Sequence, residues 1–434
     1  MLQRHKHQAL LAGGCVRDLL LGREPSDYDV ATDATPVEVA GLFPESVAVG
    51  AQFGVILVPR DGMKVEVATF RSDVGYSDGR HPDRVVYSKA PREDVQRRDF
   101  TINGLLMRHD SGEVLDFVGG REDLQAGVIR AIGDPERRFA EDKLRMMRAV
   151  RFAARFGFEI ESATFRAIRR HVKDIQQVSM ERLRDELTKM LTEGAARRAF
   201  ELLDDSWLLS QTLPEVAAMK GVEQPPEFHP EGDVWIHTRM MLEMLGQGAS
   251  PTLAWGVLLH DVGKPPTFQS AAETGDRIRF NHHVEVGVRM AGEICRRLRF
   301  SNEDTDQIVA LVANHMKFGV VEEMKKATLK RFVRLPKFDE HQELHRLDCL
   351  SSHRQLEAYE FVQRFLEETP SEQVRPGRLL SGDDLLEMGY QAGPKFARIL
   401  REVEDAQLEG LIRTNAEARE FVRRNYARAE SKSV

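Results

Sequence analysis

The sequence predicts a multidomain protein with an α+β head followed by three helical regions. At 434 residues the chain is too long for one ordinary hydrophobic core. Short strand and helix patterns alternate up to about residue 133, and helical periodicity runs on from Asp134. Prolines concentrated in residues 214–233 interrupt that periodicity. The predicted boundaries give a head over residues 1–133, then helical regions over 134–225, 226–355 and 356–434.

Within the head, we expect two short strands and a long polar segment. Val55–Val58 and Lys64–Phe70 have strand patterns and flank a turn at Asp61-Gly62. Residues 73–95 are polar, punctuated by glycine and proline, and poorly periodic, which predicts a mobile loop. The apolar pattern returns over Phe100–Met107.

Composition and cysteine spacing indicate a globular protein of a reducing compartment. Cys15, Cys295 and Cys349 are scattered without C-x-x-C spacing, so neither a disulfide framework nor a thiolate zinc site is expected. No signal peptide opens the chain, and no apolar run approaches the roughly 20 residues that span a bilayer. We therefore expect a cytoplasmic protein without membrane contacts, and the sequence indicates no obligate protein partner.

Charge is unevenly distributed along the chain. The net charge of −7 argues only weakly against a nucleic-acid partner, because segregated charge is hidden in a total. The segment 137–170 is rich in arginine, and includes Arg137, Arg138, Arg145, Arg148, Arg151, Arg155, Arg169 and Arg170. A basic stripe on an otherwise acidic protein is compatible with a phosphate-backbone partner.

The most informative segment is residues 10–32, LLAGGCVRDLLLGREPSDYDVAT. An apolar run ends in Gly13-Gly14, a short amphipathic segment follows, and a strand then contains Asp27 and Asp29. Alternation along a strand places both carboxylates on one face, where they repel unless a cation lies between them. Mg²⁺ prefers one or two carboxylates plus phosphate oxygens, and a Gly-Gly turn before a helix offers N–H groups to phosphates. The segment predicts a metal-dependent nucleotidyl transfer site.

Glu66 is the candidate third carboxylate of this site. It lies mid-strand between Val65 and Val67, and we expect it to be buried and therefore paired or metal-bound. A buried ion pair with Arg71 or Arg98 is the alternative. The expected chemistry is in-line attack of a 3′-hydroxyl on an α-phosphate, assisted by two metal ions.

Two charged strings follow. RRDFTINGL, Arg97–Leu105, offers cations for phosphates and a carboxylate for a ribose hydroxyl, although a charged turn alone would explain it. EDKLRMMRAVRFAAR, Glu141–Arg155, predicts a helix with Asp142, Arg145 and Arg148 on one face. That face is either a salt-bridge ladder or a set of acceptors and donors for a base edge.

A histidine-rich constellation lies in the third region. It consists of His237, His260-Asp261, His283, His315 and Asp348. The sequence WGVLLHDVGK predicts an apolar helix that contains the His-Asp pair, where burial without a partner would cost several kcal/mol. A divalent transition metal is the expected partner of such imidazole and carboxylate groups, and its identity stays open. His282 is adjacent and is not included.

The strings of the head and second region, in this order and spacing, resemble the class II tRNA nucleotidyltransferase (CCA-adding enzyme) and bacterial poly(A) polymerase family. The likeness covers residues 10 to about 200 strongly and the tail from Ser381 moderately. It implies a polymerase-β-like head with a mixed sheet and helices, followed by an all-α neck, body and tail that hold the tRNA acceptor arm. The segment 116–124 resembles the family's hinge, and residues 73–95 resemble its flexible loop, whose full length disfavours an enzyme that adds only CC.

The same resemblance implies roles for single residues. Asp27, Asp29 and Glu66 are the implied catalytic residues and ligands of Mg²⁺. The implied nucleotide-binding residues are Gly13, Gly14, Arg17, Arg98, Asp99, Asn103, Asp142, Arg145 and Arg148, of which the last three recognise the base.

The order of the histidine constellation resembles the HD phosphohydrolase superfamily over residues 233–355. His237, His260, Asp261 and Asp348 match its basic metal-ligand set, and His283 and His315 match the extra ligands of two-metal members. Lys264 matches a common position beside the ligands. The resemblance implies hydrolysis of phosphate esters by a metal-activated water, with a purely structural domain as the alternative.

Together these features predict template-independent addition of CCA to the 3′ end of tRNA from CTP and ATP, with a second phosphohydrolase activity in the HD domain. An enzyme that adds only the terminal A and a poly(A) polymerase share every motif, and no single residue separates them. A rival from another class is an HD phosphohydrolase whose head merely binds RNA.

Overall fold

The computed structural model describes residues 1–50, 54–60, 62–75 and 83–426. The chain forms two compact units. Unit 1 consists of Met1–Gly221, Leu242–Ala254 and Ile294–Phe300, and the other described residues form unit 2. Within the described residues, no helix is both long and apolar enough to cross a membrane.

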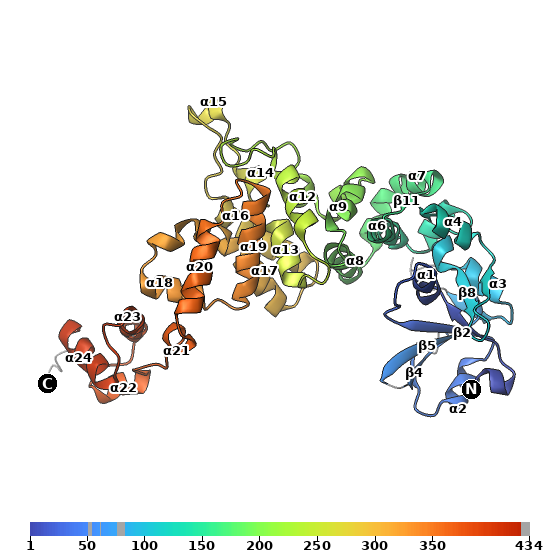
Figure 1. Cartoon of the computed structure of the whole chain (residues 1–434), viewed down its shortest axis with the longest axis horizontal. Coiled ribbons are helices and arrows are strands. Elements are labelled where there is room, and N and C mark those ends of the chain that lie inside the picture. Colours follow the sequence, from blue (N-terminus) through green and yellow to red (C-terminus); the bar gives the residue numbers. More distant parts are fainter. Residues whose placement is uncertain (51–53, 61, 76–82, 427–434) are drawn as a thin grey trace. The chain divides into compact units, whose positions relative to one another are not determined.

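The head is built on a mixed seven-stranded sheet with the order β3-β4-β5-β2-β1-β8-β9 (Figure 1). The strands β2 and β5 are parallel, and every other neighbouring pair in this sheet is antiparallel. The α+β fold class predicted for the head is therefore confirmed. The strands are β1 Ala9–Ala12, β2 Tyr28–Thr32, β3 Val47–Gly50, β4 Val55–Arg60, β5 Met63–Thr69, β8 Leu105–Arg108 and β9 Val114–Asp116.

Alternation along the strands gives this sheet two apolar faces. Leu10 and Ala12 of β1 pack with Phe70 and Leu106, whereas Val67 of β5 packs in a second cluster. A capping box at Thr35 starts α2, which contributes to the second cluster. The four α-helices of the head are α1 Gly14–Leu20, α2 Pro36–Leu42, α3 Pro91–Gln96 and α4 Gly120–Ala126.

The mobile loop expected over residues 73–95 is wrong for the part that the structure describes. A two-stranded ribbon, β6 Arg71–Val74 with β7 Arg84–Tyr87, precedes α3. The ribbon is tied to α3 by charge, because Arg97 lies between Asp94, at 2.6 Å, and Asp73, at 3.7 Å. Ion pairs leave no hydrophobic periodicity in the sequence, which explains the wrong expectation. Residues 76–82, and Asp61 of the predicted turn, lie outside the described residues.

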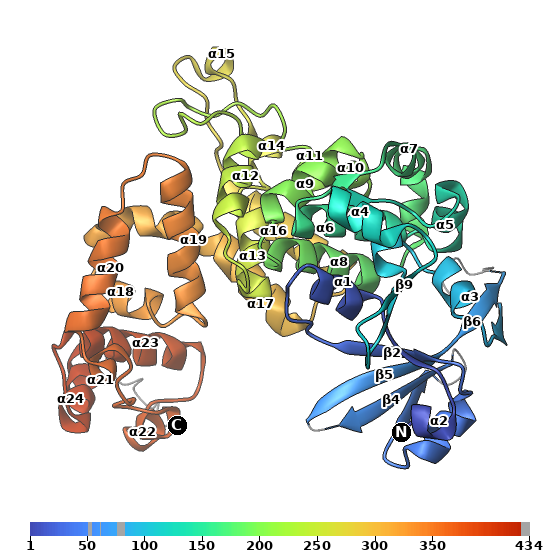
Figure 2. The same cartoon turned by 45° about the vertical axis from the view of Figure 1, so that its right-hand side comes forward.

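Helices follow the head in unit 1. They are α5 Pro135–Glu141, α6 Arg145–Phe156, α7 Ser162–His171, α8 Met180–Thr192, α9 Ala196–Asp205, α10 Leu208–Thr212 and α11 Pro214–Ala217. Figure 2 shows α6, α8 and α9 lying together. A short parallel pair, β10 Val128–Ile129 with β11 Glu159–Ile160, joins the end of the head to the chain that follows α6.

The single helix predicted over Glu141–Arg155 is wrong, because the chain turns at Asp142. Asp142 ends α5 with extended dihedral angles, and α6 begins at Arg145. The Asp142 carboxylate accepts a hydrogen bond from the Leu144 N–H, which is the local competition with the helix that short acidic side chains provide. Asp142 and Arg145 therefore lie at the two ends of a turn and do not share a helix face.

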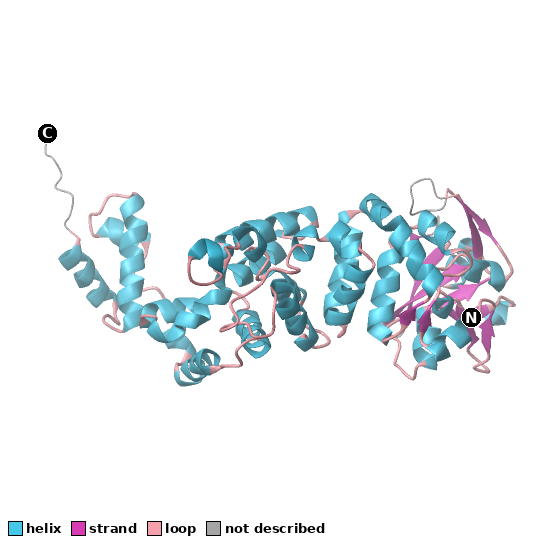
Figure 3. Ribbon diagram, turned by 90° about the horizontal axis from the view of Figure 1, so that it is seen from above, coloured by secondary structure: helices cyan, strands magenta, loops and turns pink. Residues whose placement is uncertain are grey.

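The rest of the described chain is helical, as predicted, and Figure 3 shows the strands gathered near the N-terminus. The helices are α12 Val234–Met244, α13 Pro251–Leu259, α14 Lys264–Thr267, α15 Ala271–Thr274, α16 His283–Arg297, α17 Asn302–Asn314, α18 Lys326–Phe332, α19 Phe338–Ser351, α20 Glu357–Glu368, α21 Ser371–Val374, α22 Gly382–Glu387, α23 Pro394–Glu409 and α24 Asn415–Asn425. A separate apolar cluster joins α22, α23 and α24. The three boundaries predicted between the four domains stay predictions.

Candidate active site and metal centre

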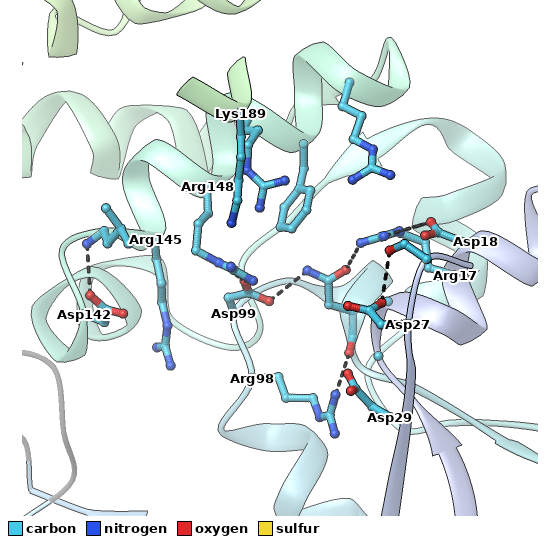
Figure 4. Close-up of a pocket in the computed structure, with 18 of the residues that line it drawn as sticks. Arg17, Asp18, Asp27, Asp29, Arg98, Asp99, Asp142, Arg145, Arg148 and Lys189 are labelled. Carbon is cyan, nitrogen blue, oxygen red and sulfur yellow. Dashed lines mark hydrogen bonds and ion pairs between the residues drawn. The ribbon is translucent and has the colours of Figure 1, made fainter. Parts of the chain in front are cut away.

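A pocket of about 630 Å³ in unit 1 gathers residues from the head and from helices α6 and α8 (Figure 4). All the predicted nucleotide-binding residues line it, namely Gly13, Gly14, Arg17, Arg98, Asp99, Asn103, Asp142, Arg145 and Arg148. Asp27 and Asp29 line it as well, whereas Glu66 does not. Figure 4 places Asp27 and Asp29 on the opposite side of the pocket from Asp142 and Arg145.

The acidic side of the pocket begins with β2. Asp29 lies in this strand directly beside Glu66 of the parallel strand β5, and Asp27 lies just before the strand. Burial, followed by the charges of Glu66 and Asp27, raises the pKa of Asp29 to about 6, against the opposing effect of Arg98. This mutual repulsion would be relieved by a cation, and carboxylates suit Mg²⁺.

Glu66 is exposed, so the expectation that it is buried is wrong. Its neighbours Val65 and Val67 pack into the apolar cluster on the other face of the sheet, and alternation turns Glu66 away from them. Its proximity to Asp29 comes from strand register and not from burial. Among the described residues, these three carboxylates do not gather into a tight ligand group of the kind present in unit 2.

Gly13 brings Arg98 close to the turn before α1. Its φ of +70° favours glycine, and a Cβ there would lie 2.7 Å from Arg98 Nη1. Arg98 also donates to Asp94, which is fully buried. The guanidinium is thus held at the pocket wall by an anion behind it.

Arg17 lines the pocket but is buried, with 4% of its surface exposed. Its Nε donates to Asp18 at 2.8 Å and its Nη1 donates to the Asn103 side-chain oxygen at 2.7 Å. Burial lowers the pKa of this guanidinium, while Asp18 opposes the change. Arg17 therefore holds Asn103 and α1 in place as well as facing the pocket.

Asp99 joins the head to α6. It accepts hydrogen bonds from the Asn103 side-chain nitrogen at 3.0 Å and from Arg148 Nε at 2.8 Å. Although burial favours the neutral acid, Arg148 and Asn103 lower the pKa of Asp99 to about 2. The result is a fixed carboxylate beside the pocket that can accept a ribose hydroxyl.

Asp142 and Arg145 provide an acceptor and donors at the far side of the pocket. The Arg145 guanidinium donates to Glu141 at 2.8 Å and to the carbonyl oxygens of Arg138 and Arg97. A guanidinium has five N–H donors, so these bonds leave donors that can face a base.

Several further cations line the pocket, of which only Arg151 and Arg155 were noted in the sequence, as part of the arginine-rich segment 137–170. Arg151, Arg155, Arg182 and Lys189 line it from α6 and α8. The spacing of Arg148, Arg151 and Arg155 along one helix face was a usable signal, but α8 is far from the other motifs in sequence. The stacked rings of Phe152 and Phe156 support these cations, with the Arg17, Arg148 and Arg151 guanidinium carbons 4.4 to 5.2 Å from the Phe152 centroid.

The HD cluster, defined as His237, His260, Asp261, His283, His315 and Asp348, lies in unit 2 and is brought together completely. His237 lies in α12, His260-Asp261 after α13, His283 at the start of α16, His315 after α17 and Asp348 in α19. Successive rings from His237 through His260 and His315 to His283 have centroids 5.5 Å apart.

The His260-Asp261 pair follows the end of α13, so the expectation that it lies within a helix is wrong. The turn packs closely on α16, because a Cβ on Gly263 would lie 2.1 Å from the His283 carbonyl oxygen. Both side chains are nearly inaccessible to solvent, which agrees with the predicted burial. Lys264 Nζ lies 2.7 Å from the Asp261 carboxylate and also donates to Gln224.

The imidazoles of the cluster are oriented as metal ligands are. The Nδ1 atoms of His260, His283 and His315 lie 2.9, 3.0 and 2.7 Å from backbone carbonyl oxygens, which assigns the proton to Nδ1. Their Nε2 atoms are buried and, among the described residues, accept or donate no hydrogen bond. Burial lowers the pKa of His315 to about 4, so its Nε2 lone pair is available. Such a donor set fits a divalent transition metal.

Carboxylates complete the centre. Asp261 forms one group of closely spaced ligand atoms with His237 and His260, and another with His283 and His315. Asp348 Oδ1 lies 3.1 Å from His237 Nε2. These two overlapping groups share Asp261, so this carboxylate would be a metal ligand together with either pair of histidines.

Two residues of this centre were missed in the sequence. Glu231 lies 2.7 Å from His237 Nδ1 and 2.9 Å from His229 Nδ1. Although burial acts against it, Asp348 and Glu231 raise the pKa of His237 to about 9. His229 lines a second pocket, of about 510 Å³, together with Lys264, His283 and Asp348. Both residues lie in the proline-rich segment that was interpreted only as a boundary.

The sequence matches three family models, one after another along the chain. They are the poly A polymerase head domain over residues 9–130, the probable RNA and SrmB-binding site of polymerase A over residues 157–220, and the HD domain over residues 233–351. The chain is thus similar to the CCA-adding enzyme and poly(A) polymerase family over its head and second region, and to HD domains over its third region. The predicted resemblance is therefore confirmed, including the HD domain.

Individual members of this family show the same likeness. The chain is 47% identical to the CCA-adding enzyme of Leuconostoc mesenteroides over 195 residues, which are 45% of this chain and 48% of that one. It is 44% identical to the CCA-adding enzyme of Bacillus pumilus over 202 residues, 46% and 50% of the two chains. The chain spans about half the length of the curated relatives it matches.

A family member of known structure resembles nearly the whole fold. The Bacillus stearothermophilus CCA-adding enzyme, in complex with CTP, covers 98% of this chain and 95% of its own with a TM-score of 0.75. The sequence identity of the two is 26%. The two chains therefore share one fold over nearly their whole length.

Proposed function

We propose that this protein adds CCA to the 3′ end of tRNA from CTP and ATP without a nucleic-acid template. The observation that supports it most is the placement of Asp142 and Arg145 opposite Asp27 and Asp29 in one pocket. Cytosine and adenine each present an exocyclic amine donor, whereas uracil and guanine present a carbonyl acceptor there. A carboxylate acceptor beside guanidinium donors matches the first two bases.

In this proposal the acidic side of the pocket performs the transfer. Asp27 and Asp29, with Glu66 beside them, would hold Mg²⁺, which supplies charge neutralisation for the triphosphate and the attacking 3′-hydroxyl. Arg98 would bind phosphate oxygens, and Asp99 would accept a hydrogen bond from the ribose. The 3′-oxygen forms a bond to the α-phosphorus, and the bond to pyrophosphate breaks.

The acceptor arm of tRNA is the proposed partner. Arg145, Arg148, Arg151 and Arg155 follow one face of α6 into the pocket, so a 3′ end that enters there meets cations. These arginines support only the binding of a phosphate backbone. The proposal that the product is CCA rests on Asp142 and Arg145, which would recognise the base. A cytoplasmic location stays a prediction, which is based on the cysteine spacing.

The decisive assay uses tRNA transcripts that end before CCA, after the first C and after CC, with CTP and ATP alone and together. Completion of all three supports CCA addition. Extension of only the transcript that ends in CC would establish an A-adding enzyme, and a long A ladder on unrelated RNA would establish a poly(A) polymerase. Asp29→Asn should abolish incorporation, while the exposed turn variant Asp110→Asn should not. Unchanged incorporation by Asp29→Asn would overturn the proposal.

We also propose a metal-dependent phosphohydrolase activity for the HD cluster, because the Nε2 atoms of His260, His283 and His315 are buried and, among the described residues, form no hydrogen bond, which suits metal ligands. A bound divalent transition metal would supply an activated water. Lys264 and His229 line the adjacent pocket, where their side chains would bind the phosphate of an ester.

This activity can be tested with a nucleoside 2′,3′-cyclic phosphate and added Mn²⁺, Ni²⁺, Co²⁺ or Zn²⁺. Asp261→Ala should abolish hydrolysis and leave CCA addition intact, whereas the exposed loop variant Asp276→Ala should change neither. Absence of hydrolysis with every metal would leave the HD domain with a structural role.

A further inference from the structure

Arg182 of α8 fixes the carboxylate of Asp142, and no sequence motif singled it out. Its Nη2 lies 2.8 Å from Asp142 Oδ2, while Asp142 Oδ1 accepts a hydrogen bond from the Leu144 N–H at 3.1 Å. Each oxygen therefore has one partner on a different part of the chain. A carboxylate oxygen has two acceptor positions, so each can still accept another donor. The plane of the group is thereby set before any nucleotide binds.

Asp142 and Arg145 are held independently of each other. Glu141 and the Arg138 carbonyl oxygen of α5, together with the Arg97 carbonyl oxygen at the end of α3, hold the Arg145 guanidinium. Arg182 holds Asp142 from α8. Arg182 lies 40 residues further along the chain than Asp142, and both side chains are largely buried, with 22% and 17% of their surfaces exposed. Removal of Arg182 would release the acceptor while leaving the donors in place.

We propose that Arg182 is a positioning residue that sets nucleotide specificity by directing the Asp142 carboxylate toward the exocyclic amine of cytosine or adenine. This inference rests on the proposed nucleotidyltransferase function. A carboxylate without this restraint rotates about its Cβ–Cγ bond and can accept instead from the ring N–H of uracil or guanine. Rejection of those bases therefore depends on orientation as well as on the presence of an acceptor.

The test compares Arg182→Met with Arg182→Lys, which keeps the charge but not the forked donors. Arg184→Gln is the matched control, because it removes a cation from the same helix outside the pocket and pairs with Asp185. The values of kcat and KM are measured for CTP, ATP, UTP and GTP, and KM is measured for tRNA. Thermal unfolding midpoints check the fold of each variant.

For Arg182→Met we expect kcat/KM for CTP and ATP to fall about 10- to 100-fold, as loss of a charge-assisted hydrogen bond implies. The kcat/KM values for UTP and GTP should stay unchanged or rise. The preference for CTP and ATP over UTP and GTP should therefore fall at least about 10- to 100-fold. The Lys variant should be intermediate, and it replaces the Met variant if the latter unfolds. In a protein that already carries Asp142→Ala, adding Arg182→Met should cause no further change in nucleotide preference.

Other outcomes separate this inference from the proposed function. A raised KM for tRNA with unchanged discrimination would show that Arg182 binds RNA and would overturn the inference. Equal losses for all four nucleotides would overturn it as well. Failure of the wild-type protein to extend any tRNA transcript would instead overturn the proposed function.

Discussion

Arg148 of α6 forms an ion pair with Asp99 of the head, with its Nη2 2.7 Å from Asp99 Oδ2. The pKa of Asp99 is about 2, below the ordinary value of 3.8. The folded state thus binds this proton less tightly than the unfolded chain does. The charged carboxylate stabilises the fold fully above the unfolded pKa, and this contribution is lost as the pH falls through about 2.

We predict that Asp99→Asn lowers the free energy of unfolding at pH 7 by about 2 kcal/mol, the size that such a pKa difference implies. Urea unfolding at pH 7, 4 and 3 measures it, and the variant should lose less stability than the wild type over the acid range. Asp110→Asn, at an exposed turn, is the control and should follow the wild type. Equal acid dependence of Asp99→Asn and wild type would contradict the prediction.

Gly13→Ala is predicted to weaken nucleotide binding. The new Cβ would meet Arg98 Nη1, and alanine would also strain a backbone with φ of +70° and ψ of −123° by about 1–3 kcal/mol. Gly112→Ala also places alanine at a positive φ, of +69°, but with open space around it, so it tests a positive φ without the clash. Kinetics should show a raised KM for both CTP and ATP only in the Gly13 variant. Similar KM values in both variants would assign the effect to strain alone.

Glu231→Gln is predicted to reduce metal affinity of the HD cluster about 10- to 100-fold, because Glu231 orients His237 through Nδ1. Metal content after dialysis and titration of the metal-free protein measure the change without reference to activity. Glu227→Gln, in the same segment and exposed, is the matched control. Unaltered metal affinity would mean that Asp348 and the packing of α12 are enough to orient His237.

Lys330→Met is predicted to loosen the contact between α18 and α23. Lys330 Nζ donates to the Leu408 carbonyl oxygen at the end of α23, and Glu409 accepts from the Ala327 N–H at the start of α18. Each helix end is thus capped by the other helix, and a buried carbonyl left without its partner costs about 1–3 kcal/mol. Hydrogen exchange of residues 394–410 should accelerate, while Lys326→Met, which is exposed, should change little. Unchanged exchange would show that apolar packing alone holds these helices.

The fold class and the positions of the site motifs were predictable from the sequence, because both depend on the local spacing of apolar and charged residues. Alternation predicted the strands around Asp29 and Glu66, and helical periodicity predicted the regions after Asp134. The turn at Asp142 was not predictable from periodicity, since the apolar spacing continues through it. Its cause is a side-chain hydrogen bond together with an ion pair to a residue far along the chain.

The missed site residues share a physical explanation. Arg182 and Glu231 act on other side chains. Arg182 lies 40 residues from Asp142, and Glu231 lies before α12 at the end of the proline-rich segment. The exposure of Glu66 was mistaken because neighbouring valines suggested burial, although alternate residues of a strand face opposite sides. Sequence patterns reveal the side chains that contact a ligand more readily than the side chains that orient those contacting residues.

The charges around the head pocket affect how fast anions arrive there. Among the described residues, nine cationic and six acidic side chains line it, on a chain whose net charge is −7. An opening with excess positive charge in an acidic molecule focuses the field, and its reach is about 8 Å at physiological ionic strength. Added salt should therefore slow the arrival of triphosphates. Elsewhere on the surface the acidic excess repels them, which favours encounters at the pocket mouth.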